Sequence, residues 1–275
     1  MDCMKIIRND KRTPDQLRPV SFSRGVFGFA PGSVLFEMGE TKVLCSVSLQ
    51  NGVPQFLRGK GTGWLTAEYA LLPMATAQRT QRESSQTGKN GRSVEIARFI
   101  GRCFRSIVDV STICERTIHI DCDVLQADGG TRTAAISGAF LALQMAQEHW
   151  LKSRVIVQPI IKDSIAAVSV GVVDDNVLLD LNYEEDSVAT ADFNFVITQS
   201  DKIVEMQGGA ETAPLSWDVF ERVRAMAQHG AQQLFFVYGD HAGKKESSYA
   251  KATADAQDER RAPMFSLKNR QQSSS

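Results

Sequence analysis

The first third of the chain alternates apolar and polar positions, which is the pattern of strands with one buried face. The alternation covers Ser33 to Met38 and Lys42 to Leu49, which a tight turn at Gly39-Glu40 joins, and it returns from Thr62 to Ala70. Strands this close in sequence pair readily, so we expect a β-rich opening to the fold.

The middle of the chain changes to helical spacing. From Ser93 to Val110 the apolar residues lie on one side of a helix and arginines lie on the other, which predicts an amphipathic helix with a basic flank. A strand is predicted from Thr117 to Leu125. It leads through a Gly-Gly turn into a nearly all-apolar stretch, Thr133 to Ala146, which predicts a buried central helix.

The last third predicts further strands and a closing helix. A hairpin is expected about Asp174-Asp175-Asn176, strands from Ala191 to Thr198 and from Ile203 to Gln207, and a helix from about Ser216 to Phe235. Sheets and helices in this mixed order indicate the α+β fold class.

Size and charge narrow the possible functions. The 275 residues suffice for one large domain or two small ones with a substantial core. With 31 basic and 32 acidic side chains the net charge is −1, so no overall positive field attracts nucleic acid. Any nucleic-acid binding must therefore come from a local basic patch.

Cysteines and histidines indicate the cellular setting. The five cysteines are odd in number and lack paired zinc spacing, and Cys45 and Cys122 fall in apolar strand patterns, so we expect reduced, mostly buried thiols. The four histidines are scattered without neighbouring ligands, which argues against structural zinc. No apolar run reaches the roughly 18 residues of a membrane helix, and the N-terminal MDCMKIIRNDKR lacks a signal-peptide core. A cytoplasmic location is expected.

The segment from Asp121 to Phe140, DCDVLQADGGTRTAAISGAF, predicts an anion site. Its two glycines let the backbone approach a ligand closely, and Thr131 or Thr133 can cap the following helix. The first helical N–H groups point outward beside the positive end of the helix dipole, and Arg132 adds a forked cationic donor. The alternative is an ordinary strand-to-helix turn with an exposed arginine.

A second segment, Asp180 to Thr198, carries five acidic residues in a stretch otherwise patterned as strand. A half-buried strand rarely carries carboxylates without a functional reason. The alternative is that the acids keep an edge strand from pairing with other chains. A third segment, Gly88 to Arg105, places Arg92 just before a helix, where it offers a second cation for the same anion.

Together these three segments resemble the ribonuclease PH family of phosphate-dependent exoribonucleases. The resemblance runs from about Asp15 to Tyr238 and includes the motifs DQLRPVSFSRG, GSVLFEMGETKVLCSVS, FLRGKGTGWLTAEYALLP, DVLQADGGTRTAAISGA and EDSVATADFN. It implies a ribosomal protein S5 domain 2-like fold for a catalytic domain of residues 1–242. It also implies phosphorolytic trimming of the 3′ ends of tRNA precursors, with nucleotide addition as the reverse reaction.

The resemblance assigns roles to site residues. Arg92 and Arg132, with the Gly130 and Thr131 amides, are expected to bind inorganic phosphate, the co-substrate. Asp186 and Asp192 match the family's catalytic aspartates, which act on the leaving 3′ oxygen and hold Mg²⁺. Glu184 and Glu185 are instead expected on a solvated edge.

The spacing of the two aspartates requires a bend. A fully extended strand advances about 3.3 Å per residue, so six steps separate the two carboxylates by roughly 20 Å, too far for one ion. The chain must therefore turn between Asp186 and Asp192. Ser187 and the small residues after it are compatible with a turn or bulge.

RNA also needs a binding track. Seven basic residues against two acidic ones lie between Arg79 and Arg105, and the RNA-binding candidates there and nearby are Arg58, Arg79, Arg82 and Arg98, with Lys60 of lower weight. Some of these arginines compete for subunit salt bridges, because the family forms homo-hexamers built as trimers of dimers. Met74 stands where many relatives carry a basic residue, which puts RNA binding or the interface in question there.

The C-terminal segment, residues 243–275, is polar, mixed in charge and ends in serines. This composition is typical of a disordered tail, and its basic excess offers weak RNA affinity as an alternative role.

Two other functions stay open at this point. One is a catalytically silent ring subunit that binds RNA, which is expected to lack the Arg132 loop or the aspartates. The other is a metal-dependent nuclease that uses water in place of phosphate.

Overall fold

The computed structural model describes residues 8–82 and 90–241. A first sheet has five strands in the order β1-β2-β3-β5-β4. They are β1 (Val20–Arg24), β2 (Gly32–Met38), β3 (Thr41–Asn51), β5 (Arg116–Gln126) and β4 (Trp64–Leu71). Only the β4–β5 pair is parallel, and the other neighbours run antiparallel. Helix α1 (Gly91–Ile107) lies between the parallel strands in sequence, as a crossover connection requires.

A second sheet has four antiparallel strands in the order β7-β6-β8-β9. They are β7 (Asn176–Leu179), β6 (Ile165–Val173), β8 (Ala191–Thr198) and β9 (Ile203–Ala210). The predicted hairpin is present between β6 and β7, where Asp174 and Asp175 both have positive φ, the backbone of a tight two-residue turn.

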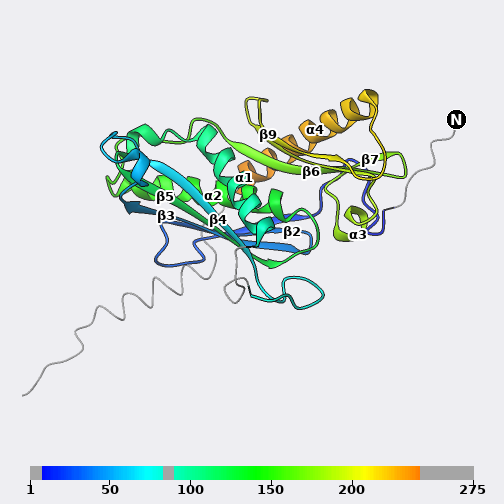
Figure 1. The fold of residues 1–275 in the computed structure, drawn as a ribbon, viewed down its shortest axis with the longest axis horizontal. Coiled ribbons are helices and arrows are strands. Elements are labelled where there is room, and N and C mark those ends of the chain that lie inside the picture. Colours follow the sequence, from blue (N-terminus) through cyan, green and yellow to red (C-terminus); the bar gives the residue numbers. More distant parts are fainter. Residues whose placement is uncertain (1–7, 83–89, 242–275) are drawn as a thin grey trace, which may run out of the picture.

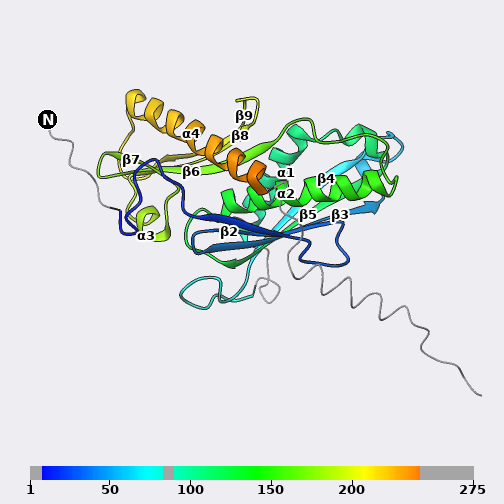
Figure 2. The same cartoon turned by 180° about the vertical axis from the view of Figure 1, so that it is seen from behind.

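Helix α2 (Thr131–Lys152) lies between the two sheets (Figures 1 and 2). It contacts β2, β3 and β5 of the first sheet and β6 of the second. This explains its composition, because a helix covered on all sides is apolar all round. Helix α4 (Trp217–His241) packs on β6 and β7, and α1 packs on β4.

The outer helices bury a single stripe each. In α4 the buried residues are Val223, Ala227, Ala231, Leu234 and Tyr238, three or four positions apart. In α1 the stripe runs from Ile96 to Ile107 and includes Phe99 and Phe104. Side chains of both sheets and these helices form one continuous core.

The predicted elements are largely confirmed, with one segment and the ends of helices corrected. The closing helix, predicted to end near Phe235, extends to His241 as α4. Residues 180–190 are not strand: β8 begins at Ala191, and a short helix, α3 (Tyr183–Asp186), precedes it. Helix α2 begins at Thr131 and not at Thr133, and it ends at Lys152, beyond the predicted Ala146. Strand β1 had no predicted counterpart.

The cysteine prediction also agrees with the structure. Cys45, Cys103 and Cys122 are buried free thiols and Cys114 is exposed and free, whereas Cys3 lies outside the described residues. The segment 243–275, predicted as a tail, also lies outside them. Among the helices that the structure describes, none combines the length and the apolar character needed to cross a membrane.

Candidate functional site

The predicted site residues come from three helices and one strand. Arg92 lies in the first turn of α1, Arg132 in the first turn of α2, Asp186 at the end of α3, and Asp192 at the start of β8. The charges of Arg92, Arg132 and Asp192 all act on the carboxyl group of Asp186, so these side chains share one region.

The turn before α2, here named the anion loop (Asp128–Arg132), has the backbone of an anion site. Gly130 is the N-cap with φ 63°, and no side chain caps the helix, so the predicted capping by Thr131 or Thr133 is wrong. The Thr133 hydroxyl instead donates to the Gly130 carbonyl at 2.9 Å. The amides of the first turn have no carbonyl partner within the helix, because helix geometry provides none, and they are available to a ligand.

The two glycines of the anion loop are required by its packing. Both have positive φ, 73° at Gly129 and 63° at Gly130. A Cβ at Gly129 would lie 2.5 Å from the Leu181 carbonyl oxygen, and one at Gly130 would lie 2.9 Å from Arg18 Nη2. The anion loop therefore lies directly against the segment that leads into α3.

Arg132 is held by one end of its guanidinium group. Its Nη1 lies 2.9 Å from a carboxylate oxygen of Glu95 and donates to Gln207 at 3.0 Å. Among the described residues, Nε and Nη2 of Arg132 make no hydrogen bond, and its side chain is 27% exposed. The arginine is thus oriented and still has donors for an anion. Sequence reasoning missed Gln207 and noted Glu95 only as a charge.

Tyr69 supports the anion loop through a hydrogen bond to Thr131. Its buried hydroxyl donates to the Thr131 hydroxyl at 2.8 Å. Burial raises the pKa of Tyr69 to about 12, and this rise is opposed by the Thr131 hydrogen bond and by the positive charges of Arg92 and Arg132. This hydrogen bond ties the start of α2 to strand β4.

Arg92 is exposed at the start of α1. The helix is capped by Asn90, whose side chain accepts a hydrogen bond from the Arg92 amide at 3.0 Å. The cap fixes the backbone of Arg92, and its exposed side chain makes no ion pair within the described part of the chain.

The predicted bend between the aspartates is present. Helix α3 begins with a capping box between Asn182 and Glu185 and ends at Asp186, after which residues 187–190 turn into β8. The turn is held at its far end, where the Thr190 amide donates to the Val172 carbonyl at 2.8 Å.

The pKa of Asp186 is shifted by burial and by neighbouring acidic side chains. Loss of water contact, followed by the negative charges of Asp192 and Glu211, raises the pKa of Asp186. The positive charges of Arg92 and Arg132 lower it only in part. Glu211 follows β9 and was not singled out from the sequence. Excess negative charge at this point is suited to a cation.

One acidic prediction is wrong. Glu185 was expected on a solvated edge but is buried, because it pairs with Arg8 through Nε at 2.7 Å and Nη2 at 2.6 Å. Glu184 is exposed as expected.

The basic track divides into two groups. Arg58, Arg79, Arg82 and Arg98 are all exposed. Arg102 instead forms a forked ion pair with Glu205, and Arg105 donates to the Leu65 carbonyl and stacks over the Trp64 ring, with 4.8 Å from Cζ to the ring centroid. These two arginines serve the packing of α1 on its neighbours. Met74 is also exposed, whereas Lys89 lies outside the described residues.

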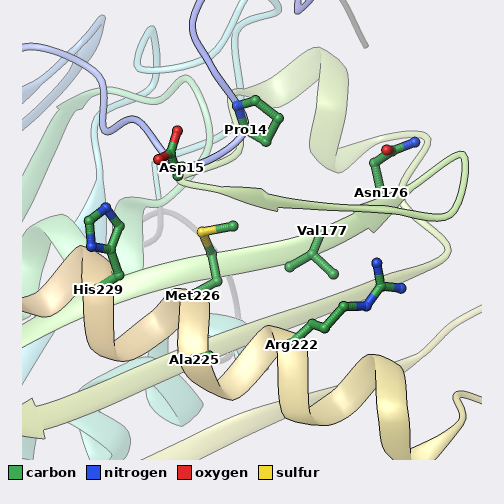
Figure 3. Close-up of a pocket in the computed structure, with 8 residues that line it drawn as sticks. All are labelled: Pro14, Asp15, Asn176, Val177, Arg222, Ala225, Met226 and His229. Atoms are coloured by element: carbon green, nitrogen blue, oxygen red, sulfur yellow. The ribbon is translucent and has the colours of Figure 1, made fainter. Parts of the chain in front are cut away.

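A cavity of about 490 Å³ lies elsewhere, between α4 and the turn that begins β7 (Figure 3). Its lining includes Asp15, Asn176, Arg222 and His229, and none of the predicted site residues.

Comparison with known families gives two matches along the chain. The 3′ exoribonuclease family, domain 1, matches residues 16–148, and domain 2 of the same family matches residues 163–230. The chain is 50% identical over 229 residues to the ribonuclease PH of Bacillus velezensis, a match that covers 83% of this chain and 94% of that protein. The ribonuclease PH of Tropheryma whipplei is 48% identical, with 83% and 93% covered.

Solved structures share the fold. The Archaeoglobus fulgidus exosome with RNA bound to the active site gives a TM-score of 0.68 at 23% identity, covering 84% of this chain and 92% of that one. Rice Rrp46 gives 0.67 at 19% identity, covering 82% and 96%. The predicted α+β, ribosomal protein S5 domain 2-like fold is confirmed.

Proposed function

The chain belongs to the 3′ exoribonuclease family that includes ribonuclease PH, and from this premise we propose how its site degrades RNA. The enzyme is a phosphorolytic 3′-to-5′ exoribonuclease. A phosphate oxygen attacks the last phosphodiester, and the bond from that phosphorus to the 3′ oxygen of the penultimate nucleotide breaks. A nucleoside diphosphate leaves, and the new 3′ hydroxyl takes up a proton.

The anion loop holds the attacking phosphate. Arg132 supplies its free donors, Arg92 supplies a second guanidinium from the start of α1, and the first-turn amides of α2 add dipoles of fixed direction. These groups offset the charge of one anion as it approaches another, which is the main barrier to the reaction.

Asp186 and Asp192 serve the scissile group and the leaving oxygen. Within the part of the chain that the structure describes, no group of three or more histidine, cysteine or acidic side chains is arranged to hold a metal alone. Two carboxylates nevertheless fit Mg²⁺, which keeps several waters and takes other ligands from substrate phosphates. When bound, Mg²⁺ would neutralise developing charge on the scissile phosphate. Which aspartate transfers the proton is left to the variants described below.

The RNA substrate and the assembly are further parts of the proposal, and the family resemblance supports them. The exposed arginines of the track bind the RNA backbone, and tRNA precursors are the proposed substrates. We place the protein in the cytoplasm, in keeping with its free thiols, as a homo-hexamer built from dimers. Residues 1–242 are proposed to act as one catalytic domain, since the site takes Tyr69 from the first sheet and Asp192 from the second.

The observation that carries this proposal is the grouping of two arginines with two aspartates at four element ends. The test incubates the purified protein with RNA and Mg²⁺, with and without phosphate, and identifies the released mononucleotide. Diphosphates that appear only with phosphate are expected. Monophosphates would indicate hydrolysis, and the absence of product would indicate a silent ring subunit. The Asp186→Asn/Asp192→Asn variant controls for contaminating nucleases.

A further inference from the structure

The segment that precedes β1 is tied to both halves of the site. Arg8 and Arg18 come from this segment, and their side chains are 0% and 4% exposed. Arg8 holds Glu185 of α3, whereas Arg18 lies between the anion loop and Asp180, which precedes α3. Buried guanidinium groups require full pairing, so each fixes the groups around it.

Arg18 makes contacts in two directions. Toward α3, its Nε donates to Asp180 Oδ2 at 3.0 Å and its Nη2 to Asp180 Oδ1 at 2.7 Å. Toward the anion loop, its Nη1 donates to the Asp128 carbonyl and its Nη2 to the Gly129 carbonyl at 3.4 Å. The planar fork of one side chain thus bonds both segments at once.

The anion loop has a second support. The Thr41 hydroxyl, at the turn between β2 and β3, donates to the Gly129 carbonyl at 2.7 Å and accepts from the Asp128 amide at 3.0 Å. The Asp128 carboxylate in turn accepts from the Tyr183 amide at 3.3 Å, at the start of α3. The anion loop and α3 are therefore joined through a small set of buried or half-buried polar groups.

We propose that Arg18, supported by Thr41, is a positioning residue that fixes the anion loop relative to the turn carrying the aspartates. The inference rests on the proposed function, in which the anion loop holds the attacking phosphate and the aspartates act on the scissile group. In a reaction between two anions the separation of the reacting groups is decisive, and a displacement of about 1 Å costs a large factor in rate. Arg18 acts through backbone carbonyls and Asp180.

The first test is Arg18→Lys. Lysine keeps a cation opposite Asp180 but lacks the fork, so it does not bond Asp180 and the loop carbonyls together. The KM for phosphate is expected to rise about tenfold, because the anion loop is no longer held in place, while RNA affinity stays unchanged. A purely structural role would reduce the amount of folded enzyme and hence the apparent kcat, but would leave the phosphate KM unchanged.

The matched control is Arg8→Lys. Arg8 is equally buried and lies on the same segment, but it bonds Glu185 and not the anion loop. Its substitution is expected to leave the phosphate KM unchanged. Equal rises in phosphate KM for both lysine variants would overturn the positioning role of Arg18.

A second variant covers the case in which Arg18→Lys folds poorly. Thr41→Val removes both hydrogen bonds to the anion loop without changing charge, and it should raise the phosphate KM in the same direction. Protection against thermal unfolding by inorganic phosphate measures the same affinity without turnover. The inference is wrong if phosphate protects Thr41→Val and Arg18→Lys against thermal unfolding as well as it protects the wild-type protein. A wild-type enzyme that releases no diphosphate with phosphate sinks the proposed function instead.

Discussion

The protein uses arginine in two contrasting regions. In the buried clamp, defined here as Arg8 and Arg18 with Glu185 and Asp180, each guanidinium group meets a carboxylate with two nitrogens. In the site, Arg132 is oriented through a single nitrogen and Arg92 is exposed. The buried clamp has its charges neutralised and holds shape, whereas the site keeps donors for a ligand.

The acidic residues show the same contrast. Asp180 and Glu185 are buried and fully paired, but Asp186 faces Asp192 and Glu211 with only partial compensation from the arginines. Charges that oppose one another are costly in a folded protein and are retained where function needs them. Pairing, more than residue type, therefore separates structural from functional charges in this protein.

The largest effect is expected from Glu185→Gln. The change removes the carboxylate that Arg8 meets and leaves a buried cation short of its partner, which costs about 3 kcal/mol of unfolding free energy. Urea unfolding at fixed protein concentration measures the loss. The neighbouring Glu184→Gln is the matched control, and because Glu184 is exposed its cost should stay within about 0.5 kcal/mol. Equal losses of unfolding free energy in the two variants would show that the buried and the exposed glutamate contribute equally to stability, contrary to this expectation.

The second effect concerns the two aspartates of the site. Asp186→Asn or Asp192→Asn keeps the side-chain volume and removes a charge, so folding and assembly should survive while turnover falls by at least about 100-fold. If the two carboxylates act as one unit, the double variant is scarcely slower than either single one. Kinetics at several Mg²⁺ concentrations add a distinction, because excess Mg²⁺ rescues only a variant that has lost metal affinity. Multiplied losses would show independent roles.

The third effect separates the arginines of the site from those of the track. Arg92→Ala and Arg132→Ala each remove a charge-assisted contact to phosphate, so the KM for phosphate should rise about 10- to 100-fold with RNA affinity nearly unchanged. Arg102→Ala is the control on the same helix as Arg92, since Arg102 already pairs with Glu205. Loss of RNA affinity at unchanged phosphate KM in the site variants would contradict the assignment.

Local patterns predicted much of this structure. Alternation identified β2, β3 and β8 because their side chains face a core on one side, and helical spacing identified α1 for the same reason. The anion loop was predicted from adjacent glycines and a following arginine, a signal contained within five residues. The aspartate bend was predicted because an extended chain does not bring the two carboxylates together.

The features that sequence reasoning missed depend on partners distant in the chain. Glu185 is buried because Arg8, 177 positions away, pairs with it. Gln207 reaches Glu95 across 112 positions, and Arg102 reaches Glu205 across 103. None of these pairings produces a periodic pattern in the nearby sequence. Sequence reasoning therefore predicted a solvated edge for Glu185 and an RNA-binding track that includes Arg102.

The smallest expected effect tests whether a cluster of acidic side chains is enough by itself to identify a functional site. Glu68 on β4 lies in register with Asp121 on β5, and Asp123 is two residues farther along the same strand. Burial, followed by the charge of Glu68, raises the pKa of both aspartates. Like charges on neighbouring strands destabilise a sheet. Among the described residues, no arginine charge acts on the pKa of either aspartate.

Glu68→Gln should therefore stabilise the protein slightly, with a melting temperature about 1 to 2 °C higher near pH 7.5. The sign follows from the raised pKa values: the repulsion is fully present above the folded-state pKa of the aspartates and disappears as the pH falls through it. The gain should thus vanish near pH 4, and melting curves at both pH values measure it. Glu37→Gln, which removes a 3.3 Å ion pair with Lys42, is the control and should not stabilise. A gain that persists at low pH would show that Glu68 acts through packing, and that crowding of charge on this sheet has no energetic cost.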